Sequence, residues 1–196
     1  MTKISENKKQ KENAIFTSAY ELFTTKGFDK TAINDIVKKA GVAKGTFYLY
    51  FRDKNHILDS IILKKTSTII KEAFTQTMKR ESEDLIESVI FFTDYTIEYL
   101  KENIILLRLI HKNLSWGLFR KALNDPEMGK DMEEIYNTFV NSLKSHSIPI
   151  EDVNETLFLI VELIGSACYS SIILNEPTTI DNMKPIIFNM IRKMLS

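Results

Sequence analysis

The sequence predicts an all-α protein of about nine helices, and three observations lead to this prediction. Gly (6) and Pro (4) are scarce among the 196 residues, whereas Leu, Ile, Phe and Met are abundant, as expected of a mostly helical chain. Apolar residues recur at three- and four-residue spacing along most of the chain. No segment shows the strict alternation of a β-strand or a repeat at fixed spacing. A chain of this length can bury a substantial core.

The first helix is expected from about Glu12 to Gly27, after an N-terminal stretch that we expect to be disordered or frayed. Gly27 followed by Phe28 is the pattern of a glycine helix end with an apolar residue folding back. Its apolar stripe consists of Ile15, Phe16, Ala19, Leu22 and Phe23.

The stretch Thr31 to Lys54 predicts two short helices joined by a tight turn. The first is expected to be N-capped by Thr31 and to end at Gly41. Its apolar face consists of Ile33, Ile36, Val37 and Ala40. In the second, Phe47 and Phe51 lie four residues apart and define a buried face, so Lys44, Thr46, Tyr48 and Tyr50 fall mostly on the other side. Two short helices joined by a glycine-containing turn favour a helix-turn-helix, whose second helix enters the major groove of DNA.

A long helix is expected to follow, N-capped by Asp53 and running to about Thr77. Some twenty-five residues span roughly 35 to 40 Å, enough to bridge two domains and act as a lever. The later helices are expected at Leu85–Lys101, Ile104–Leu114, Leu118–Leu123, Asp125–Ser145 and Asp181–Leu195. Another helix is expected to begin at a capping pair, Asp152 and Glu155, and to run to Leu174. Pro185 is most easily placed in the first turn of the last of these helices.

The formal net charge is zero, but the charge is unevenly divided. Residues 1–56 hold 11 Lys and Arg against 6 Asp and Glu, and the remainder holds 15 against 20. We therefore expect a helix-turn-helix domain at 1–56 that meets a polyanion, and a helical ligand-binding and dimerisation domain at 57–196. Lys-rich termini are often ordinary solvated surfaces, so the charge supports the DNA interpretation without establishing it.

Several classes of protein are disfavoured by composition. One cysteine and three scattered histidines argue against a disulfide framework and a cysteine-based zinc site, and they favour a reducing cytoplasm. The N-terminus lacks the apolar run of a signal peptide. The apolar stretch Leu157–Leu174 contains Glu162, Gly165 and three serines, so we expect a buried helix and no membrane association. No metal cluster, cofactor motif or catalytic arrangement is visible, so no enzyme activity is expected.

The N-terminal sequence resembles the DNA-binding domain of the tetracycline-repressor (TetR) family of transcription regulators. The matching residues are Gly27-Phe28, Thr31, Ile33, Asp35-Ile36, Ala40-Gly41-Val42, Lys44-Gly45-Thr46, Tyr48, Phe51, Lys54 and Leu58. The resemblance covers about residues 12–60 and implies a set of DNA contacts: Thr31, Lys44, Gly45, Thr46, Tyr48, Tyr50 and Lys54, the last of these to a phosphate. Ala43 and Leu49 depart from the family pattern, because Ser or Thr is more common at the first and a polar or aromatic residue at the second.

Elementary chemistry supports these contacts. Gly45 has no Cβ to hold the backbone away from DNA, Thr46 and the tyrosines can donate to phosphates, and Lys44 can reach a phosphate or a guanine edge. For Tyr48 and Tyr50 the alternative is packing against the first helix. Without a hydroxyl at Ala43, the second short helix lacks an N-cap worth about 1 kcal/mol.

The last two helices resemble the family's dimerisation element, a bundle of two helices from each subunit. Small residues between Gly165 and Ser171 allow close helix approach, and apolar residues lie on more than one face of Leu157–Leu174. The candidate interface residues are Leu157, Val161, Ile164, Gly165, Cys168, Ile172, Ile187, Met190, Ile191 and Met194. A two-fold dimer would present its two recognition helices about 34 to 36 Å apart to a near-palindromic operator.

An inducer pocket is expected among the aromatic residues of the central helices, although such stripes are more often plain core. The candidates are Phe91, Phe92, Tyr95, Tyr99, Leu106, His111, Trp116, Phe119, Tyr136, Phe139 and Glu162. Their composition favours an apolar or aromatic ligand. Glu162, if buried, would need a partner or a cationic ligand.

The leading hypothesis is a cytoplasmic, homodimeric, ligand-responsive DNA-binding regulator, most simply a repressor released from its operator by the ligand. The alternative is a helical small-molecule sensor or carrier that has lost sequence-specific DNA binding, supported only by Ala43 and Leu49. A helical enzyme using His111 or Glu162 is disfavoured, because no second catalytic group is visible. The sequence does not reveal the inducer, the operator, the regulated genes or the sign of regulation.

Overall fold

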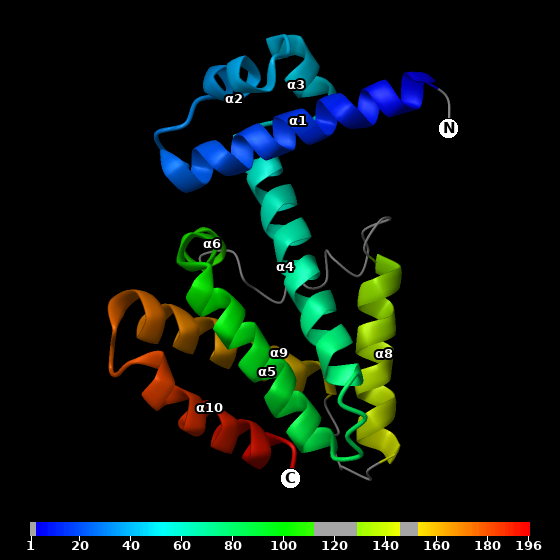
Figure 1. The fold of residues 1–196 in the computed structure, drawn as a ribbon, viewed down its shortest axis with the longest axis vertical. Helices are drawn as coiled ribbons and strands as arrows, with labels where there is room; N and C mark the ends of the chain where they lie inside the picture. The colour runs from blue at the N-terminus through cyan, green and yellow to red at the C-terminus, as the bar shows by residue number, and fades with distance from the viewer. Residues whose placement is uncertain (1–2, 112–128, 146–152) are drawn as a thin grey trace. The chain divides into compact units, whose positions relative to one another are not determined.

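The computed structural model describes residues 3–111, 129–145 and 153–196, which form nine α-helices and one π-helical segment without a strand (Figure 1). The predicted all-α class is therefore confirmed. The helix expected at Leu118–Leu123, the expected helix start at Asp125 and the expected cap at Asp152 lie outside the described residues. The elements are α1 (Lys3–Thr25), α2 (Ile33–Ala40), α3 (Lys44–Tyr50), α4 (Lys54–Met78), α5 (Leu85–Glu102), α6 (Ile104–Ile110), α8 (Gly129–Ser145), α9 (Val153–Cys168), the π-helix η1 (Tyr169–Leu174) and α10 (Ile180–Met194).

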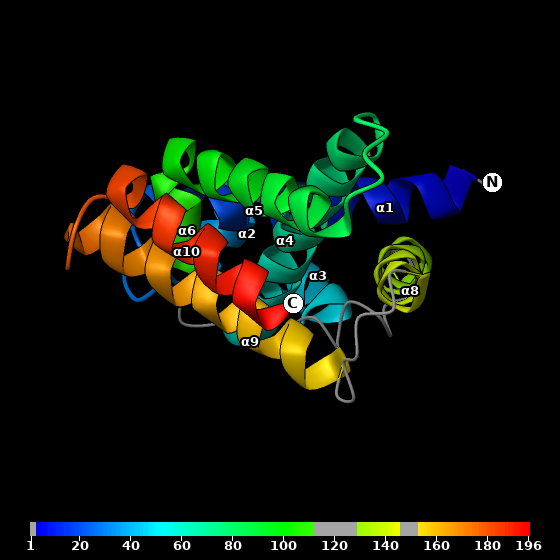
Figure 2. The same ribbon diagram turned by 90° about the horizontal axis from the view of Figure 1, so that it is seen from below.

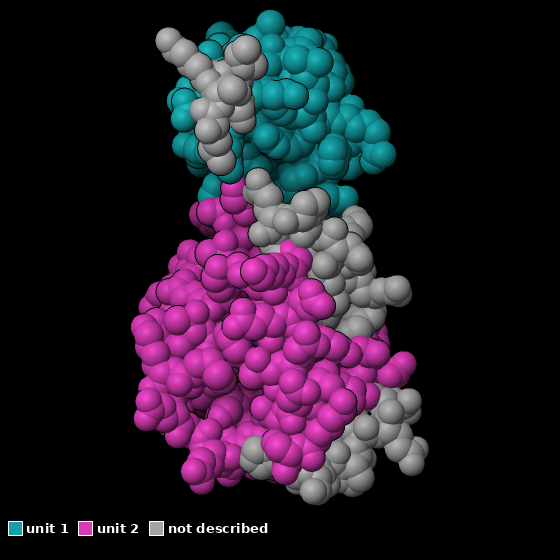
Figure 3. All heavy atoms as spheres, turned by 90° about the vertical axis from the view of Figure 1, so that its right-hand side faces the viewer, with its two compact units in different colours: residues 1–62 teal, residues 63–196 magenta. Residues whose placement is uncertain are grey.

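The chain divides into two compact units, residues 1–62 and 63–196, which are coloured separately in Figure 3. The division falls within α4, a few residues beyond the boundary expected after residue 56. Each unit buries its own apolar side chains. The core of the first includes Ile15, Ala19, Phe23, Ile36, Phe47, Phe51, Ile57 and Ile61. That of the second includes Ile97, Leu107, Ile110, Met132, Leu143, Ile187 and Ile191.

In the first unit, α2 and α3 both pack against α1 (Figure 1). Helix α1 begins at Lys3, well before the expected start near Glu12, so the polar N-terminal stretch is helical. The Gly27 backbone has φ 93°, a left-handed conformation that a residue with a side chain adopts only under strain. Phe28 then lies edge-on against Phe23, with ring centroids 5.1 Å apart. The predicted glycine end of the first helix is thus present.

In the second unit, α10 packs on both α5 and α9. Ion pairs join α10 to α5: Lys184 Nζ contacts the carboxylates of Asp94 and Glu98, and Lys101 Nζ lies 2.6 Å from Asp181 Oδ1. Burial lowers the pKa of Lys184, but its hydrogen bonds to the two carboxylates outweigh this effect, and the pKa is raised.

Pro185 lies inside α10 and not in its first turn, contrary to expectation. The helix begins at Ile180, one residue before the expected start, and the carbonyl of Thr179 accepts hydrogen bonds from the N–H groups of Asn182 and Met183, so Pro185 is the sixth residue of the helix. Proline at this position removes the N–H that would otherwise bond to the carbonyl of Asp181.

The segment formed by α9 and η1, Val153–Leu174, is long and apolar enough to cross a membrane by length and composition alone. Only 17% of its most apolar stretch is buried inside the chain, and most of the other residues are half-buried, so the expected buried helix is only partly covered in a single copy. Figure 2 shows α9 and α10 side by side. Exposed apolar side chains on these elements are Phe158, Leu159, Leu174, Ile186 and Met190.

Candidate DNA-binding surface and ligand cavity

Helix α2 is capped at its start by Asp35 and not by Thr31. Ala32 is the N-cap residue, and its N–H donates to Asp35 Oδ2 at 3.1 Å. The hydrogen bond from Lys26 Nζ at 2.6 Å, followed by that from Ala32, lowers the pKa of Asp35 below its usual value. Thr31 is only 1% exposed and its hydroxyl donates to the carbonyl of Gly27 at 2.7 Å. The predictions that Thr31 caps α2 and contacts DNA are both wrong, because its side chain faces the end of α1.

The turn between α2 and α3 consists of three residues, Gly41 to Ala43. Gly41 is left-handed, with φ 67° and ψ 31°, and its N–H bonds back to the last turn of α2. Val42 N–H donates to the carbonyl of Val37 at 3.0 Å. Helix α2 therefore ends at Gly41, as predicted, and α3 begins three residues later, at Lys44, with a different axis direction.

Helix α3 buries one face and exposes the other. Phe47 is fully buried and Phe51, just beyond the helix, is 4% exposed, as predicted. On the opposite side Tyr48 is 51% and Leu49 76% exposed. Lys44 and Gly45 are also exposed, and Thr46 is half-buried. A Cβ added to Gly45 would meet no atom within 4 Å, so nothing inside the chain requires glycine there. Ala43, the N-cap residue of α3, provides no side-chain cap.

Tyr50 and Lys54, two of the predicted DNA contacts, bond within the first unit. The Tyr50 hydroxyl donates to the backbone carbonyl of Lys8 on α1 at 3.0 Å, which is the alternative of packing against the first helix. Lys54 Nζ donates to the carbonyls of Phe28 and Thr31 at 2.8 and 3.1 Å and lies 4.2 Å from the centroid of the Phe28 ring. These contacts hold the α1–α2 connection against the start of α4, so Lys54 has a structural role that the sequence did not reveal.

Asp53 caps α4, as predicted. Its Oδ1 accepts from the N–H of His56 at 2.8 Å, and this hydrogen bond is the main cause of the lowered pKa of Asp53. In return, the N–H of Arg52 donates to Nδ1 of His56 at 3.0 Å. The arrangement resembles a capping box with histidine in place of the usual Glu or Gln, except that His56 accepts from the residue before the N-cap. The role of His56 was not predicted, although its position three residues after Asp53 was a signal.

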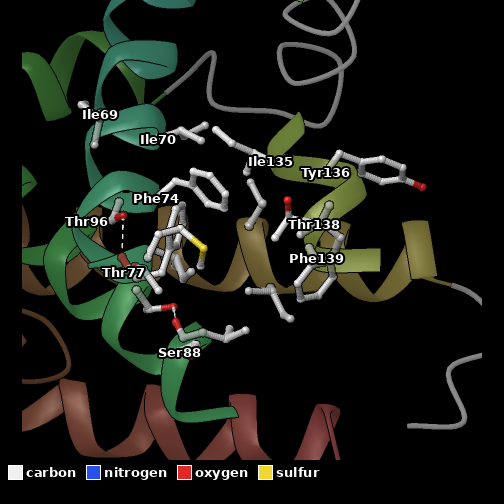
Figure 4. A pocket seen from close by; sticks show the side chains of 18 of the residues that line it. Ile69, Ile70, Phe74, Thr77, Ser88, Thr96, Ile135, Tyr136, Thr138 and Phe139 are labelled. Atoms are coloured by element: carbon white, nitrogen blue, oxygen red, sulfur yellow. Dashed lines mark hydrogen bonds between the residues drawn. The ribbon is translucent and has the colours of Figure 1, made fainter. Parts of the chain in front are cut away.

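A cavity of about 400 Å³ lies within the second unit among α4, α5, α8 and α9 (Figure 4). Of the predicted ligand residues, Phe92, Tyr136 and Phe139 line it. The Tyr136 ring points away from the side chains of α4 and α5, and its hydroxyl donates to Asn154 Oδ1 at 2.8 Å. The lining from α4 was missed, although the apolar residues of this helix, such as Ile70 and Phe74, are too many for one narrow face.

The structure does not bring the other described candidates into this cavity. Phe91 lies under the guanidinium of Arg80, at 4.3 Å, and the Tyr95 hydroxyl donates to Glu72 Oε1 at 2.8 Å. The His111 ring stacks on Tyr169, with centroids 3.3 Å apart. Also absent from the lining are Tyr99, Leu106 and Glu162. Trp116 and Phe119 lie outside the described residues.

The candidate dimer residues are divided between the interior and the surface. Leu157, Val161 and Ile164 line the cavity. Cys168, Ile187 and Ile191 are buried in the chain itself and have no surface to offer a partner. Gly165, Ile172 and Met194 are half-buried, and Met190 is 40% exposed. The sequence pattern selected apolar helix positions but did not distinguish the face toward the cavity from the face toward solvent.

Within the described ranges, no group of three His, Cys, Asp or Glu side chains is placed to hold a metal ion. Two candidate sites remain in the described residues: the exposed face of α3 in the first unit and the cavity in the second. A short helix, a three-residue turn and a second short helix with an exposed face define the first unit as a helix-turn-helix module.

Comparison with known proteins identifies the group to which this module belongs. Residues 15–61 match the family described as "Bacterial regulatory proteins, tetR family". A curated relative, the HTH-type transcriptional regulator YvdT of Bacillus subtilis, is 53% identical over 51 residues, which are 26% of this chain and 26% of that protein. The module formed by residues 15–61 is thus a DNA-binding domain of the tetR family of bacterial regulatory proteins. The matches with the first curated relatives span only 26%, 35% and 37% of their lengths.

Solved structures extend the likeness of fold to nearly the whole chain. A crystal structure of RolR in complex with resorcinol has a TM-score of 0.72 at 17% identity, covering 98% of this chain and 90% of that one. The transcriptional regulator FadR from Bacillus subtilis in complex with stearoyl-CoA has a TM-score of 0.59 at 18% identity, covering 93% and 98%. At these identities the likeness concerns the fold alone.

Proposed function

We propose that this chain is a homodimeric, ligand-responsive transcription regulator that binds a near-palindromic operator through α3 and represses until a small apolar or aromatic molecule enters the cavity. The observation that carries the proposal is the exposed face of α3. Lys44 provides a cation, Gly45 a close backbone approach and Tyr48 a phenol, while Phe47 anchors the helix from below. The exposed Leu49 suits apolar contact with a thymine methyl group.

The remaining parts of the proposal rest on the second unit. The exposed apolar side chains of α9 and α10 suit a two-fold contact with a second copy. Helix α4 supplies cavity residues from Leu63 onward, and its first residue, Lys54, binds the α1–α2 connection. A ligand that displaces α4 would therefore also act on this connection. The ligand can shift the equilibrium between the DNA-binding and the released conformation only as far as its difference in affinity for the two conformations allows. Resorcinol in RolR and stearoyl-CoA in FadR are in keeping with a small-molecule or acyl ligand.

Selection of bound sequences from random DNA provides the first test, and we expect enrichment of a near-palindrome. Replacing both Lys44 and Tyr48 with Ala should then weaken binding to that sequence about ten- to a thousandfold at fixed salt, because a phosphate or base contact and a groove contact are lost. Both side chains are exposed, so the fold should persist. Lys193→Ala, at an exposed position on α10, is the control.

Unchanged affinity of the double variant would refute the assigned face. If the selection enriches no palindrome, the result favours the alternative of a sensor or carrier that no longer reads DNA.

A further inference from the structure

The cavity in the second unit is elongated along α4 and α5. Its lining residues recur every three or four positions on each helix, from Leu63 to Met78 on α4 and from Leu85 to Leu100 on α5. This is the spacing of a single helix face, so the cavity follows both helices. Fifteen residue steps along a helix correspond to roughly 22 Å.

The cavity is narrow for this length. Its volume is about 400 Å³, and division by the length gives a mean cross-section of roughly 18 Å². A single extended alkyl chain has a similar cross-section, whereas a compact ring system of equal volume is wider and shorter. The walls are largely apolar, with side chains such as Ile70, Phe74 and Phe92, and they suit contact with methylene groups (Figure 4).

The two ends of the cavity differ in exposure. Among its described lining residues only Met78, Ser82 and Glu83 are exposed, and they lie at the end of α4 or in the connection to α5. At the opposite end, Leu100 and Ile110 are 2% and 1% exposed. A ligand can therefore keep a polar head in water at the first end, which avoids the cost of desolvating that head, while its chain extends toward the second.

Resting on the proposed function and narrowing its ligand class, we infer that the inducer is a linear aliphatic amphiphile. Its chain lies along α4 and α5, and its head stays at the exposed end beside Ser82 and Glu83. A compact or aromatic molecule of the same carbon number fills only part of the length and leaves apolar wall uncovered.

The first test compares two ligands with twelve carbons and one hydroxyl each, 1-dodecanol and cyclododecanol, by titration calorimetry. They differ in shape and not in polar group. We expect the linear alcohol to bind at least about tenfold more tightly, because two methylene groups left without apolar contact cost about this factor. Equal or weaker binding of the linear alcohol, or binding of neither, would overturn the inference.

A pair of variants tests the path of the chain. Thr96 lines the cavity roughly 16 Å beyond Leu85 along α5, so Thr96→Phe places a ring where only a long chain reaches. This variant should weaken hexadecyltrimethylammonium at least about tenfold and leave octyltrimethylammonium nearly unchanged, both below their micellar concentrations. Thr68→Phe, at an exposed position of α4, is the control and should change neither.

Equal effects of Thr96→Phe on both chain lengths would contradict the assigned path. The comparison of the two alcohols uses the unaltered chain and stands even if this variant fails to fold.

The position of the head is tested by reversing a charge at the exposed end. Glu83→Lys should strengthen binding of dodecanoate and weaken binding of dodecyltrimethylammonium, each about two- to fivefold, the size of a charge interaction at an exposed site. Glu176→Lys, at an exposed position between η1 and α10, is the control. Unchanged affinities in the first variant would refute this orientation of the ligand.

Operator binding without ligand is measured separately. A chain that binds its palindrome but does not prefer the linear alcohol disproves this inference alone. A chain that binds the amphiphile and no DNA disproves the proposed function and leaves the assignment of the cavity intact.

Discussion

At the scale of the residue, two lysines of the helix-turn-helix region have different roles because different backbone groups surround them. Lys44 and Lys54 both lie in the stretch that predicts DNA binding. Lys44 is exposed on α3, whereas the ammonium of Lys54 donates hydrogen bonds to the carbonyls of Phe28 and Thr31. Charge and spacing alone do not separate these roles, because the carbonyls that bind Lys54 come from a connection 23 to 26 residues away in sequence.

Lys54→Met should therefore destabilise the first unit by about 1 to 3 kcal/mol, since two carbonyls lose a charged donor. The methionine stem retains the packing of the lysine chain. The measurement is denaturant unfolding of the full chain, followed by a probe in the first unit. Lys44→Ala, the matched control, should leave this transition unmoved. Equal stability of the two variants would show that the Lys54 contacts contribute nothing to the fold.

At the scale of the element, the sequence predicted helices well where local signals decide them and poorly where distant contacts do. Gly27, Gly41 and Asp53 each mark a helix end through local backbone chemistry, and the structure has helix ends at all three. Thr31 carried an equally plausible local signal, yet its hydroxyl bonds to Gly27 because the end of α1 lies beside it.

The cavity shows the same limit of local reasoning. Phe92 and Phe91 are adjacent in an aromatic run, but only Phe92 reaches the cavity. Which of the two points inward depends on how α5 is rotated against its neighbours. Helical periodicity identifies apolar faces without saying whether an empty space, a core or a partner lies opposite.

The cap of α4 makes a prediction about pH. The pKa of Asp53 is lowered in the folded protein by the N–H of His56, so the cap stabilises the fold above the ordinary value of 3.8 and is lost as pH falls through the lowered pKa. Asp53→Asn retains an acceptor that does not titrate. The difference in unfolding free energy between the original chain and this variant should be constant near neutral pH and should shift against the original chain in acid. A difference independent of pH would show that the carboxylate is not the cap.

At the scale of the whole molecule, the exposed apolar side chains of α9 and α10 are the feature that a single chain leaves unexplained. Ile186 and Leu159 are 52% and 53% exposed, on helices that pack against each other. Under the proposed function they are covered by a second copy. The double variant I186E/L159E should then be monomeric by sedimentation and should bind the operator more weakly, because one recognition helix is no longer linked to the other.

A control variant separates this effect from a general effect of surface charge. Ile105→Glu alters a side chain of equal exposure, 55%, on α6, and it should leave the association state unchanged. A double variant that remains dimeric would move the proposed interface away from α9 and α10.

Cys168, the chain's one cysteine, reports on the integrity of the second unit. Burial raises the pKa of its thiol to about 12, and the side chain is 0% exposed at the junction of α9 and η1. Since the thiolate is the reactive form, a disulfide reagent should modify Cys168 only when this part of the unit opens. Labelling should be slower by orders of magnitude in the folded protein than in denaturant, and slower still when a ligand occupies the cavity. In the variant T75C/C168A the thiol is placed at an exposed position of α4 and should react rapidly in the folded state. Equally rapid labelling of Cys168 would mean that α9 and η1 open freely, and a cavity bounded by α9 would then not be a stable site.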